Sequence, residues 1–140
     1  MAIELVPLAT ATIRIKEPIM LPNTPRGTRA IIEVPEATYE GERMRAKLKG
    51  VAAADWVTVG PDGTASLDVR LTVETDDGAL IFVSYGGRTD VSEGIGAAPV
   101  YSTPLFETGD ERYAWLNKVQ TVAKGTIEGD VLTYEIYEVR

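Results

Sequence analysis

The segment TASLDVRLTVETDDG, residues 64–78, alternates apolar and polar side chains with a period of two. Leu67, Val69, Leu71 and Val73 lie on one face, and the polar residues between them lie on the other. This period is typical of a β-strand that buries one face and exposes the other. If such strands close into a barrel, the alternation by itself leaves open which face lines the interior.

Further segments share this alternation or the β-branched and aromatic content of strands. They are residues 9–16, 29–34, 43–48, 56–59, 79–85, 119–127 and 131–139. Tight-turn sequences separate neighbouring segments, and they are residues 60–63 (GPDG), 76–78 (DDG) and 128–130 (EGD). Because a connection between parallel strands needs about a dozen residues, segments this close predict an antiparallel, mainly up-and-down sheet.

One segment, residues 110–118 (DERYAWLNK), has two interpretations. Asp110 is a suitable N-cap for a helix, but Tyr113 and Trp115 also alternate as in a strand, which we favour. With so many strands, the fold class is all-β, and 140 residues fit a single domain, residues 1–140. We expect a closed or nearly closed antiparallel β-barrel of the calycin-like, small-ligand type, because closure removes exposed strand edges.

Two absent residue types exclude whole classes of chemistry. The chain has no cysteine and no histidine, which excludes disulfides, thiol nucleophiles, serine–histidine triads and histidine or thiolate zinc sites. Acid–base chemistry then falls to Asp, Glu, Tyr, Lys or water, and a carboxylate can act as base if burial raises its pKa. We expect neither a metal nor a cofactor, since the aspartates at 62, 76 and 77 follow hairpin-turn spacing and not calcium-loop spacing.

The charge balance limits the partners. The net charge is −7 and the basic residues are scattered, which argues against nucleic acid, because phosphate contacts need clustered Lys and Arg. No apolar run approaches the roughly 18 residues that span a bilayer, and the N-terminal residues read as a strand and not as a signal peptide. We therefore expect a cytoplasmic protein with no membrane or nucleic-acid partner, whose partner is a small molecule.

Several motifs, taken in order, resemble a widespread microbial family catalogued as a domain of unknown function, number three-two-three-seven. They are ADW, PDGTA, LDVR, TDDGA and YAWLN, carried on residues 24–29, 50–83 and 103–117, with YEIYEV closing the chain. The resemblance covers nearly the whole chain. It implies a single antiparallel β-barrel similar in shape to small-ligand barrels, often packed as a homodimer or larger homo-oligomer. It implies no established activity and no catalytic residue.

Asp68 and Arg70 share one face of the central strand, roughly 6.5 Å apart along it. On the barrel exterior they would form a surface pair worth less than about 1 kcal/mol. In the lumen, Arg70 would bind a substrate oxyanion and Asp68 would act as a base. Asp55, just before Trp56, has a similar choice between capping a turn and presenting its carboxylate at the barrel mouth.

Residues 103–117 combine aromatic side chains with polar ones. If residues 113–117 form a strand, two aromatic rings and an amide face the same side, as in an aromatic-walled pocket. Core packing at one barrel end is the alternative. The glycine-containing loop 86–104 is a candidate lid, or else a mobile connection or a contact with another subunit.

The leading hypothesis is a small-molecule-binding barrel that acts as a cofactor-independent enzyme of the isomerase, lyase or cyclase type. A carboxylate would be the base, while arginine, tyrosine and amide groups stabilise negative charge on oxygen and indoles form walls. The candidate catalytic residues are Asp55, Asp68, Arg70 and Glu107, and the candidate binding residues are Trp56, Tyr85, Tyr113, Trp115 and Asn117.

Two other classes stay open. A non-catalytic ligand-binding or oligomeric scaffold protein would keep Asp68 and Arg70 outside and fill its centre with valines and leucines. A lactone or small-ester hydrolase would need an activated nucleophile or water, and the sequence contains no Gly-x-Ser-x-Gly motif.

Overall fold

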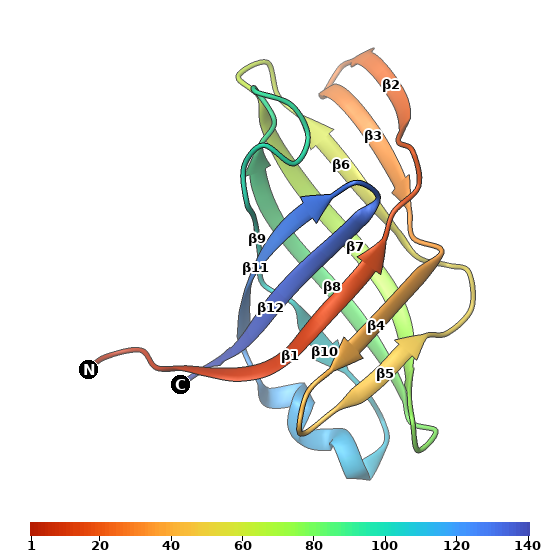
Figure 1. The fold of residues 1–140 in the computed structure, drawn as a ribbon, viewed down its shortest axis with the longest axis vertical. Helices are drawn as coiled ribbons and strands as arrows, with labels where there is room; N and C mark the ends of the chain where they lie inside the picture. The colour runs from red at the N-terminus through yellow and green to blue at the C-terminus, as the bar shows by residue number, and fades with distance from the viewer.

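The computed structural model describes residues 1–140 and consists of β-strands with one 3₁₀ helix (Figure 1). The elements are β1 (Leu5–Arg14), β2 (Ile19–Thr24), β3 (Gly27–Glu33), β4 (Glu36–Glu40), β5 (Arg45–Leu48), β6 (Ala54–Val59), β7 (Thr64–Thr75), β8 (Leu80–Asp90), β9 (Val100–Ser102), β10 (Leu105–Glu107), η1 (Glu111–Lys118), β11 (Thr121–Glu128) and β12 (Val131–Val139). The predicted alternating segments correspond to strands. Sequence analysis missed β2, β4, β9 and β10, because short runs carry little periodic signal and β2 contains Pro22.

The strands close into a barrel in which every pairing is antiparallel. The order is β8-β9-β11-β12-β1-β4-β5-β7, and pairing between β7 and β8 closes the ring of eight strands. The predicted fold class, an all-β antiparallel barrel, is confirmed. The strand β10 pairs with β8 alongside β9, and no helix of the chain is long and apolar enough to cross a membrane.

The long strand β7 changes its partner along its length, and this creates the second part of the fold. Its C-terminal end, residues 73–75, pairs with β5 as part of the barrel wall, whereas residues 65–70 pair with β6. Strand β6 pairs with β3, and β3 pairs with β2. These three strands, β2, β3 and β6, form an extension that rises beyond one end of the barrel (Figure 1).

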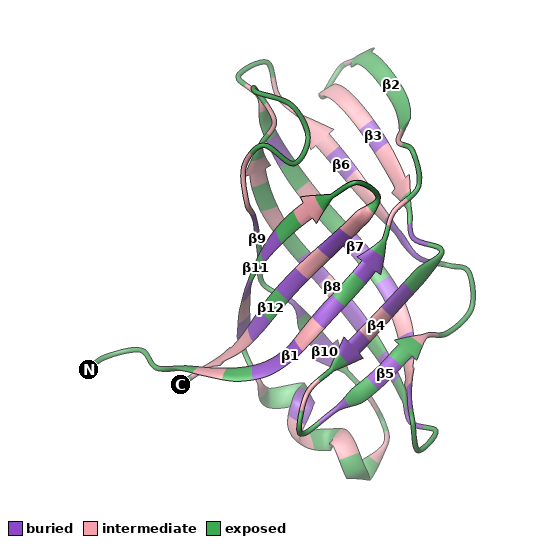
Figure 2. Cartoon of the chain, viewed as in Figure 1, coloured by how far each residue is buried: buried purple, intermediate pink, exposed green.

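The inward face of β7 is the apolar one. Val69, Leu71 and Val73 are buried, whereas Asp68 and Arg70 are exposed on the outer face. The same alternation of buried and exposed positions runs along β1 and β12 (Figure 2). The interpretation that placed Asp68 and Arg70 in the lumen is therefore wrong, because the hydrophobic effect turns the aliphatic face of β7 into the barrel.

One end of the barrel is filled and closed. Buried side chains from several strands pack there, and Leu116 of η1 covers them with no exposed surface. The 3₁₀ helix replaces the strand that we favoured for residues 110–118. Its N-terminus is capped as the alternative interpretation required, since the Asp110 Oδ1 accepts a hydrogen bond from the Arg112 N–H at 2.9 Å.

Candidate functional site

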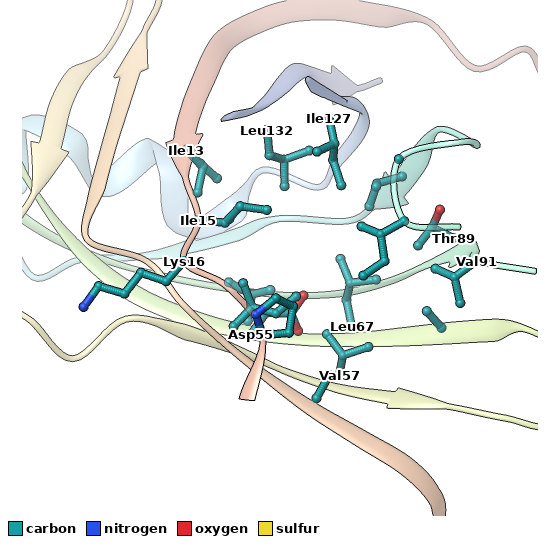
Figure 3. Close-up of a pocket in the computed structure, with 18 of the residues that line it drawn as sticks. Ile13, Ile15, Lys16, Asp55, Val57, Leu67, Thr89, Val91, Ile127 and Leu132 are labelled. Atoms are coloured by element: carbon teal, nitrogen blue, oxygen red, sulfur yellow. The ribbon is translucent and has the colours of Figure 1, made fainter. Parts of the chain in front are cut away.

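A cavity of about 760 Å³ occupies the other half of the barrel and continues under the extension. Aliphatic side chains form most of its wall. Ile13, Ile127 and Leu132 come from β1, β11 and β12, Val57 and Leu67 come from β6 and β7, and Ile15 directly follows β1 (Figure 3). A cavity of this size and composition can hold a drug-sized organic molecule.

The predicted lid loop lies at this cavity. Val91, Gly94, Ile95 and Gly96 all line it, and Ile95 is 60% exposed. Gly94 and Gly96 adopt φ values of 107° and 87°, a backbone conformation that side-chain-bearing residues rarely adopt. The loop is shorter than the predicted residues 86–104, because residues 86–90 belong to β8 and residues 100–102 to β9, which leaves residues 91–99 as the connection.

Asp55 is the one acidic residue of the cavity lining that is not exposed to solvent, and it lies among apolar side chains (Figure 3). It lies on β6 opposite Val69 of β7. Pairing between the two strands is interrupted at residues 56–57 and 67–68, and there Asp55 Oδ1 accepts a hydrogen bond from the Asp68 N–H at 2.9 Å. The carboxylate thus replaces a backbone acceptor in the ladder.

Burial raises the pKa of Asp55 from its ordinary value of 3.8 to about 6. The removal of the carboxylate from water is the main cause, and the negative charge of Asp68 adds to it, while the hydrogen bond from the Asp68 N–H acts in the opposite direction. No salt bridge involves Asp55. A carboxyl group with this pKa populates both protonation states near neutral pH, as an acid–base catalyst must.

Two buried tyrosines also line the cavity. The rings of Tyr85 on β8 and Tyr134 on β12 meet edge to face, with centroids 5.7 Å apart. Burial raises the pKa of both phenols, and the charge of Asp55 raises both further. The two hydroxyls therefore stay protonated at neutral pH and lie within electrostatic reach of the Asp55 carboxylate.

Charged groups other than Asp55 lie around the cavity opening. Lys16, Glu17 and Asp130 contribute to its lining. The Lys16 side chain points away from the other labelled residues in Figure 3, and Asp130 binds the Arg14 guanidinium at 2.8 Å. Apart from Thr28 and Thr89, the interior therefore presents one carboxylate and two phenols within a mostly aliphatic wall.

Several site residues predicted from the sequence lie outside the cavity. Arg70 stacks its guanidinium over Trp56, 4.3 Å from the ring centroid, on the outer face of the sheet. Glu107 is exposed on β10. The structure thus separates Asp68, Arg70 and Glu107 from Asp55. Trp56 is half-buried beneath the exposed Arg70 and does not line the cavity.

The candidate residues of η1 lie at the closed end of the barrel. The Tyr113 hydroxyl donates to Asp77 Oδ1 at 2.9 Å, and Trp115 packs under the Arg43 guanidinium at 4.7 Å. Asn117 accepts from the Thr108 N–H and donates to the Thr108 carbonyl. These contacts match the alternative of packing at one barrel end, and of the predicted set only Asp55 and Tyr85 line the cavity.

Tyr134 was not among the predicted site residues. The signal was present, since Leu132, Tyr134 and Ile136 alternate in the predicted strand 131–139 and all three are buried. A tyrosine among inward-facing aliphatic residues indicates a polar group in the interior.

Fold and cavity together define a class: an eight-stranded antiparallel barrel with an apolar, ligand-sized cavity that contains a carboxyl group with a raised pKa. Residues 3–139 match the family described as "Protein of unknown function (DUF3237)". The chain belongs to this family, as its motifs indicated.

Relatives of known sequence agree with this assignment. A UPF0311 protein of Bradyrhizobium diazoefficiens is 28% identical in an alignment that covers 93% of this chain and 92% of that protein. The hydroalkoxylation enzyme phnH of Penicillium herquei is 39% identical over a shorter stretch of 62 residues, which covers 44% of this chain and 35% of the enzyme.

Solved structures share the fold. A β-barrel-like protein from Acinetobacter baumannii has a TM-score of 0.88 and 28% identity, with 100% of this chain and 98% of that chain covered. An enzyme from Penicillium herquei has a TM-score of 0.71 and 23% identity, covering 99% of this chain and 94% of its own. The barrel is therefore a fold that at least one distant relative uses as an enzyme.

Proposed function

We propose that this protein binds a small, largely apolar molecule in the cavity and catalyses proton transfer on it, with Asp55 as the acid–base residue. The observation that carries the proposal is the Asp55 carboxyl group, held among aliphatic side chains with a pKa of about 6. A base is most effective when its pKa lies near the working pH. The apolar wall keeps competing water away from the reacting groups.

The reaction class that this site fits best is the intramolecular addition of a hydroxyl group to a carbon–carbon double bond. The hydroxyl oxygen forms a bond to one alkene carbon while its proton passes to the Asp55 carboxylate. The other alkene carbon takes a proton from the carboxyl group, so that Asp55 ends in its starting state. The product is a cyclic ether and an isomer of the substrate, so the step is redox-neutral.

The relative from Penicillium herquei supports this choice of reaction. Its name describes a hydroalkoxylation enzyme, and addition of an alcohol across a double bond is the reaction written above. The cyclase, isomerase and lyase types expected from the sequence all require the same kind of proton transfer. Among them, an addition without a separate leaving group makes the fewest demands on a site with one carboxylate.

The charges of the cavity favour a neutral substrate. The one charged group deep in the lining is the acidic Asp55, and Arg70 lies outside. A carboxylate or phosphate group on the substrate would lose hydration without gaining a cationic partner. We therefore expect an alkenyl alcohol or alkenyl phenol in place of an organic acid.

The test uses 2-allylphenol and 2-prenylphenol as substrates, with product isomers separated by chromatography and identified by NMR. We expect the wild-type protein to form the cyclic ether and Asp55→Asn to lose at least about 100-fold in kcat/KM, the usual contribution of a positioned acid–base group. Glu107→Gln is the matched control, because it removes an exposed carboxylate outside the cavity. Equal rates for Asp55→Asn and wild type would refute the role of Asp55.

A non-catalytic carrier is the second candidate. The exposed Asp68 and Arg70 favour it, because the scaffold interpretation required both to lie outside. Its other requirement, a barrel centre filled by valines and leucines, is not met, because the cavity occupies part of the interior. A carrier would bind the same phenols with saturation and leave them unchanged over a long incubation. Binding together with turnover that depends on Asp55 distinguishes the enzyme from the carrier.

A further inference from the structure

Three buried hydroxyl groups of the barrel interior have no hydrogen-bond partner: those of Tyr39, Ser102 and Tyr134. Leaving a buried hydroxyl unpaired destabilises a fold, so each calls for an explanation. Of the three residues, only Tyr134 lines the cavity. It is 1% exposed to solvent.

The position of the Tyr134 ring depends on a glycine in the neighbouring strand. Gly125 of β11 lies directly opposite Tyr134 in the β11–β12 ladder. A methyl group at position 125 would lie 2.7 Å from two carbons of the Tyr134 ring, which is closer than side chains pack. The absence of a side chain at Gly125 thus lets the ring lie across β11.

The Tyr134 hydroxyl has polar neighbours, but no contact with them has the geometry of a hydrogen bond. Burial is the main cause that raises its pKa and the Asp55 charge adds to it, whereas polar contacts with the Tyr85 and Ser102 hydroxyls lower it. None of them forms a hydrogen bond of normal geometry with it. The two phenol rings are in contact, and the Asp55 charge acts on both phenols, so these three groups are neighbours in a cavity whose lining is mostly apolar.

We infer that Tyr134 and Tyr85 form the subsite that binds the oxygen atom of the ligand, and that this ligand carries a neutral hydroxyl or carbonyl oxygen at one end. The ligand oxygen would accept from the phenol donors, and a ligand hydroxyl would also place its own proton beside Asp55. The hydrocarbon part would then lie against the aliphatic wall formed by residues such as Ile13, Leu67 and Leu132. The inference rests on the proposed function only in taking the cavity as the ligand site.

The test compares three probes of the same ring size: 2-naphthol, 2-methylnaphthalene and 2-naphthoate. Fluorescence titration or calorimetry gives Kd for each. We expect wild-type protein to bind 2-naphthol more tightly than 2-methylnaphthalene and to bind 2-naphthoate most weakly. Tyr134→Phe and Tyr85→Phe should each raise the Kd for 2-naphthol about five- to tenfold, as expected for loss of one neutral hydrogen bond. The Kd for 2-methylnaphthalene should stay unchanged.

Tyr39→Phe is the matched control. It also removes an unpaired buried phenol, but Tyr39 packs against Phe106, with ring centroids 6.3 Å apart, and does not line the cavity. It should leave all three affinities unchanged. Gly125→Ala keeps both phenols but displaces the Tyr134 ring, so it should reduce the preference for 2-naphthol over 2-methylnaphthalene.

Three results would overturn the inference: no preference for 2-naphthol in the wild-type protein, equal weakening of both neutral probes, or the same effect from Tyr39→Phe. Failure of the proposed function has a different signature. If Asp55→Asn retains turnover while the tyrosine variants lose selective binding, the catalytic role of Asp55 is refuted and the oxygen subsite is supported.

Discussion

Replacing Asp55 with asparagine should stabilise the protein, and the gain should grow with pH. In the folded state the pKa of Asp55 is about 6, against 3.8 in its ordinary environment. Between these two values the folded protein holds a proton that the unfolded chain has released. The free energy of unfolding therefore falls as pH rises through this range, and the loss is complete above pH 6.

The magnitude follows from the difference between the two pKa values. A difference of about 2 units corresponds to about 3 kcal/mol, which is an upper limit for the penalty at pH 7–8. Asparagine keeps an oxygen that accepts from the Asp68 N–H but carries no charge to desolvate. We expect Asp55→Asn to raise Tm by roughly 5–10 °C at pH 8, and to change it much less at pH 4.

Urea unfolding of wild type and Asp55→Asn at pH 4, 6 and 8 measures this effect. Other carboxylates, such as Asp62, Asp77 and Glu138, have lowered pKa values and contribute their own pH dependence, which cancels in the difference between the two proteins. Glu107→Gln should show no comparable gain at any pH. A stability difference that is the same at all three pH values, or a loss of stability at pH 8, would refute the desolvation argument.

Two further predictions concern the barrel interior. Leu67→Trp should fill part of the cavity and abolish saturable binding of 2-naphthol while the protein still unfolds cooperatively, and unchanged affinity would show that the probe binds elsewhere. Tyr39→Phe should be neutral or stabilise the protein by about 1 kcal/mol in urea unfolding, because its hydroxyl is buried without a partner, whereas a clear loss of stability would mean that a bound water satisfies it.

The strand content and the barrel followed from local patterns in the sequence. The alternation in residues 64–75 predicted β7 within its observed bounds, and the turns at 76–78 and 128–130 predicted the hairpins that join β7 to β8 and β11 to β12. These features are local, since period and turn residues are read over a few positions. The extension of β2, β3 and β6 was not predicted, because it depends on which distant strands pair.

The helix η1 shows a conflict between two local signals. Tyr113 and Trp115 alternate as in a strand, and this outweighed the capping residue Asp110 in the sequence interpretation. In the structure the cap is formed, and tertiary contacts hold the helix against the barrel end through the Tyr113–Asp77 hydrogen bond and the Arg43–Trp115 stack. A period of two over so few residues is too short to decide between the two structures.

The candidate site depended on distant strands even more than the fold did. Asp55, Tyr85 and Tyr134 come from β6, β8 and β12, and no spacing in the sequence brings them together. Asp68 and Arg70 were attractive because they are charged and share a face, but a charged face of a strand normally turns to solvent. The cavity instead uses single polar residues placed among aliphatic ones, which leave a weak signal in the sequence.

The strongest argument for a function at Asp55 is the energetic cost of its position. The interruption between β6 and β7 needs only an acceptor for the Asp68 N–H, and a neutral asparagine or serine oxygen would supply it. A carboxylate in this place lowers the free energy of unfolding by up to about 3 kcal/mol at neutral pH. Proteins depart from the most stable local choice chiefly at functional sites. A group that destabilises the fold only when it is ionised is such a departure, and the proposed role of Asp55 as a proton acceptor would account for it.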